Sequence, residues 1–238
     1  ELEQIGEVIH HQKTGLLCRP GNVEDLKAAL LRLAEDPALR KRLGQAARAD
    51  VLANYTWEAH VARTMKKLEE YVRSIPDFPE KGIIFRDITT VIQDPNGFHL
   101  AIDAMIEKVK DLDFDLVVGL DARGFIFGSA IAYALGKGFV PCRKKGKLPC
   151  ETVCASYELE YGTAEIELHK DSIAKGQKVI IVDDLIATGG TVEACAKLVE
   201  ELGGIVEKIV FLLELAGLHG RDKLEAYDVA SVITYEGK

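Results

Sequence analysis

One segment, VIIVDDLIATGGT from Val179 to Thr191, constrains the fold of this chain more than any other part. It begins with apolar β-branched residues, which are typical of a central parallel strand buried on both faces. Two adjacent carboxylates follow, and then a short loop of small residues. Beyond the loop, apolar residues recur at helical spacing as far as Gly203-Gly204, a typical helix end. The segment therefore predicts a strand, a loop and a helix of an α/β fold.

The loop has the features of a phosphate-binding site at the carboxyl end of its strand. Glycines let backbone N–H groups approach an anion, threonines add hydroxyl donors, and the helix dipole favours a dianion. Carboxylates repel phosphate but accept hydrogen bonds from sugar hydroxyls, so Asp183 and Asp184 point to a sugar. A tight turn with an acidic rim is the structural alternative. The combined pattern favours a phosphorylated sugar, held by Ala187, Thr188, Gly189, Gly190 and Thr191.

This segment resembles the phosphoribosyl-pyrophosphate (PRPP) motif of type I phosphoribosyltransferases. Four more segments resemble the adenine phosphoribosyltransferases and follow that family's order and spacing: IPDFPEKGIIFRDIT from Ile75, GLDARGFIFG from Gly119, RKKGKLP from Arg143 and YELEYGT from Tyr157. The resemblance runs from about Leu68 to Lys238. It implies a purine salvage enzyme that transfers the 5-phosphoribosyl group of PRPP to adenine, giving AMP and pyrophosphate.

The fold implied is the type I phosphoribosyltransferase fold, an α/β domain with a mostly parallel central sheet. DLVVGLD, FVPC, VIIVDD and IVFLLEL are the strand candidates, with helices between them. TVCASYELEYG alternates as a strand does, and AEIELHK is its predicted hairpin partner. A small hood over the base is expected near residues 75–90.

Basic residues after two of these strands are candidates for a pyrophosphate clamp. Arginine makes forked contacts with phosphates, whereas lysine is a mobile point charge suited to a closing loop. By resemblance, Ala122 and Arg123 form the pyrophosphate loop, whose first peptide bond is often cis. The other candidates, Arg143, Lys144 and Lys147, lie in RKKGKLP, which taken alone is more typical of a solvated surface. The resemblance also implies a homodimer in which Arg143 reaches the neighbouring active site.

The base pocket and the proton route come from two further segments. Phe85 offers an aromatic face for a purine, although core packing is the alternative for a single phenylalanine. By resemblance, the backbone of Ile84 and Arg86 contacts the adenine edge, and Leu185 closes the other side. The candidate acid/base is Glu160, because a carboxylate near the anomeric carbon stabilises positive charge and exchanges a proton with the base. Its neighbour is predicted to position the phosphates or the sugar, and this residue is Tyr161.

Magnesium is the expected cofactor, because the charge of a leaving pyrophosphate must be screened and Mg²⁺ binds mainly through substrate oxygens and water. No dedicated protein metal site is predicted, since Cys150 and Cys154 have no neighbouring His or Cys partners. Five cysteines suggest reduced thiols in the cytoplasm. A net charge of −8 argues against nucleic acid, and no apolar run reaches the length of a membrane span.

Residues 1–67 differ in character from the rest and read as helices. Asn22 and the pair Asp36-Pro37 are typical helix starts, and Thr56 is a third. No Gly, Pro or Ser lies between Thr56 and Ser74, which favours a helix that continues into the second region. The segment resembles the C-terminal tail of family-4 glycosyltransferases. Because most of such an enzyme is absent, we expect a non-catalytic appendage before a catalytic domain at 68–238.

Three other functions fit parts of the pattern. A catalytically inactive PRPP-binding regulator would keep the same phosphate-binding loop, residues 187–191, which we call the cradle. The acidic chain, however, lacks a basic DNA-binding segment. A phosphoribosyltransferase for another purine, such as a 6-oxopurine, would share most of the site. The third alternative is a glycosyltransferase, on the strength of residues 1–67.

Overall fold

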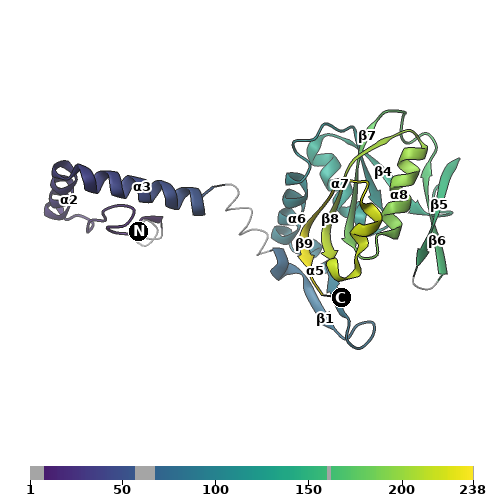
Figure 1. Cartoon of the computed structure of the whole chain (residues 1–238), viewed down its shortest axis with the longest axis horizontal. Coiled ribbons are helices and arrows are strands. Elements are labelled where there is room, and N and C mark those ends of the chain that lie inside the picture. The colour runs from purple at the N-terminus through teal and green to yellow at the C-terminus, as the bar shows by residue number, and fades with distance from the viewer. Residues whose placement is uncertain (1–7, 57–67, 160–161, 238) are drawn as a thin grey trace. The chain divides into compact units, whose positions relative to one another are not determined.

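The computed structural model describes residues 8–56, 68–159 and 162–237. The chain divides into two compact units, Glu1–Thr64 and Met65–Lys238 (Figure 1). None of the helices in the described ranges has the length and apolarity that crossing a bilayer requires.

The first unit contains two helices, α2 (Val23–Glu35) and α3 (Pro37–Asn54), both of which begin where the sequence predicts. The side chain of Asn22 accepts a hydrogen bond from the Asp25 N–H, and that of Asp36 accepts one from the Leu39 N–H. These bonds satisfy amides that have no partner within a helix. The helix expected after Thr56 lies mostly in 57–67, outside the described residues, although residues 68–71 are helical.

The second unit is an α/β domain. In chain order its elements are β1 (Arg73–Pro76), β2 (Ile84–Asp87), α5 (Thr89–Gln93), α6 (Pro95–Glu107), β3 (Leu116–Leu120), α7 (Arg123–Leu135), β4 (Gly138–Lys144), β5 (Thr152–Leu159), β6 (Gly162–His169), β7 (Lys178–Ile186), α8 (Gly190–Glu201), β8 (Ile205–Leu215), η1 (Ala216–Leu218), η2 (Gly220–Leu224) and β9 (Val229–Tyr235). Seven of the strands form one sheet in the order β5-β6-β4-β3-β7-β8-β9.

The sheet is mostly parallel, as the sequence predicts. Strands β4, β3, β7, β8 and β9 run parallel to one another, whereas β6 pairs antiparallel with both β4 and β5. The four predicted parallel strands and the predicted hairpin of β5 and β6 are confirmed. Strand β9 was not among the sequence-based candidates.

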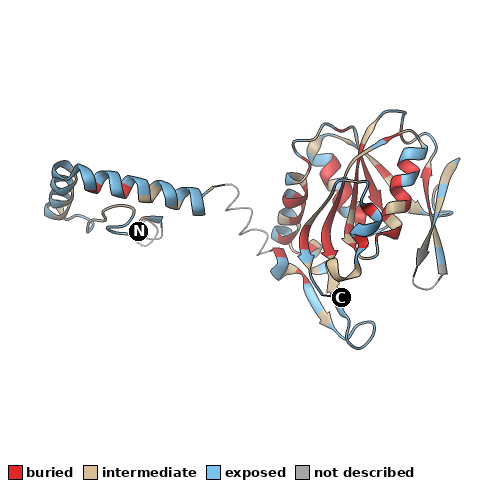
Figure 2. Ribbon diagram, viewed as in Figure 1, coloured by how far each residue is buried: buried red, intermediate tan, exposed pale blue. Residues whose placement is uncertain are grey.

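Helices cover both faces of the sheet, and the alternation of side chains along each strand explains why. Val117 and Ile180 pack in one apolar cluster with residues of α6 and α7. Their neighbours Val118 and Ile181 point to the opposite face, into a second cluster with residues of α8. Figure 2 shows the buried residues concentrated along the sheet and on the helix sides that face it. Burial on both faces accounts for the continuous apolar runs of the central strands.

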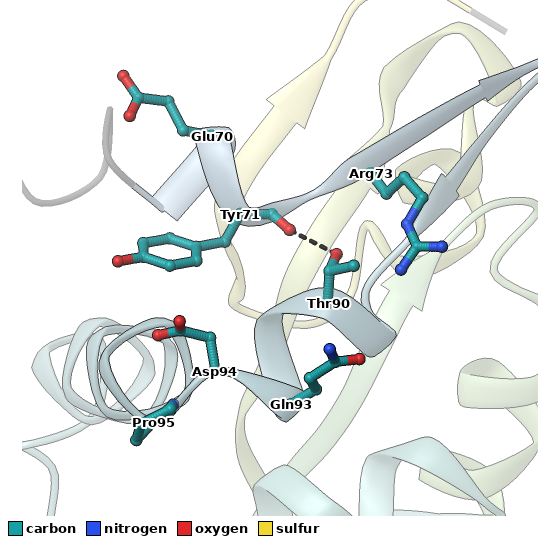
Figure 3. Close-up of a pocket in the computed structure, with 7 residues that line it drawn as sticks. All are labelled: Glu70, Tyr71, Arg73, Thr90, Gln93, Asp94 and Pro95. Carbon is teal, nitrogen blue, oxygen red and sulfur yellow. Dashed lines mark hydrogen bonds between the residues drawn. The ribbon is translucent and has the colours of Figure 1, made fainter.

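Strands β1 and β2 form a separate antiparallel pair in the region predicted as the hood. Contacts with α5 and β9 join this region to the rest of the domain. The Thr90 hydroxyl donates a hydrogen bond of 2.5 Å to the Tyr71 carbonyl, which links α5 to the residues just before β1 (Figure 3). The Arg86 guanidinium lies 3.9 Å from the centre of the Tyr235 ring in β9, a cation–π contact. The same guanidinium donates a hydrogen bond to the Ser74 hydroxyl.

Candidate active site

Three neighbouring parallel strands end at one edge of the sheet. Their ends bring together the residues predicted to bind phosphate and sugar. Leu120 of β3 lies opposite Cys142 of β4, and Gly119 lies opposite Val182 of β7. The residues that follow are therefore side by side: the predicted pyrophosphate loop after β3, Arg143 on β4 and the two aspartates on β7. Open α/β sheets bind ligands at this edge.

Ion pairs organise the clamp. The Arg123 Nε lies 2.9 Å from an Asp184 carboxylate oxygen, and the Arg143 Nε lies 3.2 Å from an Asp121 oxygen. The Asp121–Ala122 peptide bond is cis, as the resemblance implied. Arg143 thus contacts the pyrophosphate loop of its own chain. Asp121 was not among the predicted site residues, although its place directly after a buried strand was a signal for it.

The two aspartates of β7 have unusual electrostatics. Burial, and then the charge of Asp184, raises the pKa of Asp183 well above its ordinary value. Burial also raises the pKa of Asp184, against the opposing charge of Arg123. The Asp184 N–H donates a 2.8 Å hydrogen bond to the Asp183 carboxylate. A Cβ atom on Gly124 would lie 2.8 Å from the Asp183 Oδ1, so the start of α7 approaches this carboxylate closely.

The predicted cradle is a small cavity. Residues Ala187 to Thr191, together with Asp183 and Leu185, line a volume of about 100 Å³ at the start of α8. Gly189 precedes the helix with φ of 75°, in the left-handed region that favours glycine. The Thr188 side chain is exposed, and Gly190 is buried as the first residue of the helix. The cavity can accept a group of phosphate size at the positive end of the helix dipole.

A second glycine, Gly220, packs closely against the backbone of the cradle. A Cβ on Gly189 would lie 2.3 Å from the Gly220 carbonyl oxygen, and a Cβ on Gly220 would lie 2.3 Å from the Ala187 oxygen. Arg221, the next residue, donates two 2.7 Å hydrogen bonds to the carboxylate of Glu214. Those bonds lower the pKa of Glu214, despite its burial. Sequence reasoning missed this support, because it joins η2 to two strand ends that only the fold brings together.

The predicted base-binding residues lie on β2, apart from Leu185 on β7. Phe85 is half-buried and meets the Phe78 ring edge-on, with 5.3 Å between ring centres, whereas Ile84 is exposed. Leu185 is half-buried on β7, at the wall of the cradle. At the end of β2, hydrogen bonds from Thr89 lower the pKa of Asp87, and the charges of Arg73 and then of Arg123 lower it further. The hood therefore ends within electrostatic reach of the clamp.

The remaining predicted residues fall into two groups. Lys144 and Lys147 are exposed near the end of β4 and form no ion pair with any residue in the described part of the chain. Glu160 and Tyr161 lie outside the described residues. Within the ranges that are described, no cluster of three or more His, Cys, Asp and Glu side chains could hold a metal ion.

A larger cavity, of about 500 Å³, lies at the base of the hood (Figure 3). Glu70, Tyr71, Arg73 and Gln93 are among its lining residues, and none of the predicted site residues belongs to it. In its lining, Asp94 accepts hydrogen bonds from the first amides of α6, and Thr90 donates one to the Tyr71 carbonyl. We therefore place the chemistry at the strand ends and not in this cavity.

Comparison with known protein families separates the two regions of the chain. The family model for the phosphoribosyl transferase domain matches residues 89–235, and the model for glycosyl transferases group 1 matches residues 3–50. Adenine phosphoribosyltransferase from Lachnoclostridium phytofermentans is 68% identical over 174 residues, which cover 73% of this chain and 100% of that protein. The enzyme of the same name from Agathobacter rectalis is 64% identical over the same shares.

Solved structures agree with these relatives. The crystal structure of adenine phosphoribosyltransferase from Thermoanaerobacter pseudethanolicus is 53% identical, with a TM-score of 0.70 over 72% of this chain and 99% of that one. The Saccharomyces cerevisiae enzyme, solved with an imino-altritol bisphosphate and adenine, is 42% identical with a TM-score of 0.68, over 72% of this chain and 99% of that one. The identity, the coverage and the fold lead to one assignment: the chain belongs to the adenine phosphoribosyltransferase family.

Proposed function

We propose that the chain is a purine salvage enzyme that transfers the 5-phosphoribosyl group of PRPP to adenine, giving AMP and pyrophosphate. One observation supports this function above the others. A phosphate-sized cavity, an acidic pair and two arginines meet at the ends of three adjacent strands, in a chain 68% identical to a complete adenine phosphoribosyltransferase. Each of these parts suits a different portion of PRPP.

We assign the parts to PRPP by charge and geometry. The loop from Ala187 to Thr191 receives the 5′-phosphate, because its amides and the dipole of α8 attract a dianion. Asp183 and Asp184 accept hydrogen bonds from the ribose hydroxyls. The pyrophosphate lies toward Ala122 and Arg123, and Lys144 and Lys147 supply further positive charge at the end of β4. In this arrangement the acids contact the uncharged part of the substrate and the bases contact its anionic ends.

Adenine is the proposed acceptor, held under the hood. Phe85 stacks on the purine, backbone groups of Ile84 and Arg86 read its edge, and Leu185 covers the other side. The half-buried Phe85 leaves part of its ring free for such a contact. The yeast relative was solved with adenine bound, which supports a base pocket of this kind. Magnesium, carried mainly by PRPP oxygens, would screen the leaving pyrophosphate, and the acidic pair could contact its water shell.

Glu160 is the proposed acid/base. Replacement of Glu160 by Gln removes the charge and the proton exchange but keeps the size of the side chain. We therefore expect kcat to fall by about 100-fold or more, as for loss of a general acid or base, with little change in PRPP affinity. Steady-state kinetics and calorimetric PRPP titration measure the two quantities. Unchanged turnover in Glu160→Gln would exclude this role, and Tyr161→Phe tests whether the neighbouring phenol positions the substrate.

The direct test of the function is an assay with PRPP, Mg²⁺ and each purine base in turn. Formation of AMP and pyrophosphate from adenine is the expected result. PRPP binding without any product would indicate a regulator instead, and turnover only with hypoxanthine, guanine or xanthine would indicate another purine phosphoribosyltransferase. Omission of Mg²⁺ is expected to stop the reaction.

We further propose a homodimer in the cytoplasm. The outer face of α7, the helix that begins with Arg123, exposes Ile126 and, about two turns further along, Tyr133, which is 91% exposed. An apolar surface beside the site suits a second copy of the chain, whose site Arg143 would then approach. Analytical ultracentrifugation of the chain and of Tyr133→Glu tests the dimer. A reducing compartment is supported by the cysteines, all five of which are free.

Residues 1–67 are proposed to be a non-catalytic appendage. The full length of the L. phytofermentans enzyme is matched by 73% of this chain, which leaves the first region outside the shared part. Only Leu39 and Leu43 are buried in helices α2 and α3. So small a buried core supports a non-catalytic role for this segment, although it matches the glycosyl transferase model. A variant that begins at Leu68 is expected to keep full activity.

A further inference from the structure

Glu167 of β6 is a buried carboxylate that neither the sequence motifs nor the ligand contacts above involve. It lies opposite Arg143 on β4 and opposite Cys154 on β5, in the middle of the antiparallel part of the sheet. The residue is only 3% exposed. The alternation of AEIELHK puts it on the face opposite Leu168, where an exposed residue is expected. A carboxylate is rarely buried unless strong donors meet it.

The donors come from the basic loop, defined here as residues 143–148. One oxygen of Glu167 accepts hydrogen bonds from the Lys147 N–H at 2.9 Å and the Leu148 N–H at 2.8 Å. The other oxygen accepts one from the Thr152 hydroxyl at 3.3 Å. Burial alone would raise the pKa of Glu167, but these hydrogen bonds outweigh it and hold the pKa below its ordinary value. Both carboxylate oxygens therefore have donors, two backbone amides on one and the Thr152 hydroxyl on the other.

Hydrogen bonds to both the N–H and the carbonyl of Lys147 fix the backbone of the basic loop. The Lys147 N–H donates to Glu167, as above, and also to the Lys144 carbonyl at 3.2 Å, which closes a turn. Its own carbonyl accepts a 3.3 Å hydrogen bond from the Arg143 guanidinium, which in turn pairs with Asp121. The backbone is thus tied to the sheet and to the pyrophosphate loop. The lysine side chains at 144 and 147 are left exposed.

We propose that Glu167 is a positioning residue for pyrophosphate: it turns the basic loop so that Lys144 and Lys147 face the leaving group. The anion acts through backbone amides. Within the described residues it forms no ion pair, so it organises the loop without neutralising either lysine. If Glu167 formed an ion pair with Lys144 or Lys147, it would neutralise a positive charge that the pyrophosphate needs. This inference rests on the proposed function, because the ligand of the loop is the pyrophosphate of PRPP.

Three variants test the role. Glu167→Met removes the acceptor at nearly constant volume, and we expect KM for PRPP to rise about tenfold, as for loss of hydrogen bonds to a charged group. Glu167→Gln keeps an oxygen for the two amides, so a rise of only about threefold is expected, following the weaker neutral bond. KM for adenine should stay within about twofold in both, because uncharged adenine does not meet the loop. Thr152→Val removes one weak donor and should shift KM for PRPP in the same direction by less.

Glu165→Gln is the matched control. Glu165 lies on the same face of β6 and contacts the same loop, but through an exposed ion pair with Lys145, 2.8 Å long. Exposed pairs contribute little, so its KM for PRPP should remain at the wild-type value. Hydrogen exchange at the amides of Lys147 and Leu148 provides a second readout. Exchange should accelerate in the order wild type, Gln, Met, with the control unchanged.

Two results would overturn the inference: a folded Glu167→Met variant with wild-type KM for PRPP, or equal losses in Glu165→Gln and Glu167→Gln. If Glu167→Met does not fold, Glu167→Gln and Thr152→Val carry the test. Failure of the inference is distinguishable from failure of the proposed function, because the wild-type chain would still form AMP. If the wild type formed none, titration of wild type and variants with inorganic pyrophosphate would test the loop alone.

Discussion

Gly189→Ala is expected to lower kcat/KM for PRPP by about 100-fold or more. The φ of 75° at this position is strained for alanine, and the added methyl group would lie 2.3 Å from the Gly220 carbonyl oxygen. Backbone of this kind costs of order 1–3 kcal/mol to hold, which corresponds to about one to two powers of ten in binding. The clash adds to that cost, because two backbone segments must separate. Steady-state kinetics with varied PRPP at saturating adenine measures the loss.

Gly176→Ala is the control for this prediction. Gly176 has φ of 85°, and no atom lies within 4 Å of the point that an added methyl group would occupy, so it isolates the strain from the clash. It also lies in a loop away from the strand ends that form the site. We expect a loss of about 1 kcal/mol in the free energy of unfolding and a kcat/KM within twofold of wild type. Similar kinetics in the two variants would show that the Gly189 contact does not shape the cradle.

Asp183→Asn is expected to reduce activity and increase stability. The ribose hydroxyls lose one of the two acceptor oxygens of the carboxyl group, which should lower kcat/KM for PRPP by about 100-fold. Stability changes in the other direction. The pKa of Asp183 is raised in the folded chain, so its protonated form stabilises the fold below the ordinary value of 3.8. That contribution is lost as pH rises through the folded-state pKa, where the buried carboxylate ionises.

The asparagine variant has no such loss, since an amide remains neutral and can still accept the hydrogen bond from the Asp184 N–H. Thermal unfolding from pH 5 to pH 9 should therefore show a Tm difference, variant minus wild type, that increases with pH. A difference that stays constant or decreases with pH would contradict the raised pKa of Asp183. Asp113→Asn is a suitable control, because its carboxylate is 92% exposed and makes only a 3.6 Å ion pair with Lys178.

The sequence predicted those elements whose patterns are local. Strands β3, β4, β7 and β8 have continuous apolar runs, and Asn22 and Asp36 have the side chains that cap helices. The cradle could be predicted for the same reason, because a strand, two acids and a glycine loop are consecutive. Because adjacent parallel strands end at the same edge of the sheet, the predicted clamp could also be expected to lie beside the cradle.

Other features depend on contacts between distant segments. Strand β9 is mostly half-buried and interrupted by Ser231 and Thr234, so its pattern does not distinguish an edge strand from a loop. Glu167 reads as a solvent-facing residue of an alternating strand, because nothing near it indicates that a loop from another strand will cover it. The pairing of Glu214 with Arg221 could not be predicted either, because only the fold shows that it holds the residue next to Gly220 against the cradle. Glu160 and Tyr161 remain predictions from the resemblance.

The contact between Arg86 and Tyr235 has a consequence for how the enzyme is made. Arg86 belongs to the hood, near the beginning of the domain, whereas Tyr235 is in the final strand, β9. A ribosome releases β9 only after every other element of the sheet has emerged. The hood is therefore synthesised early, but its cation–π contact with Tyr235 can form only after β9 has been made.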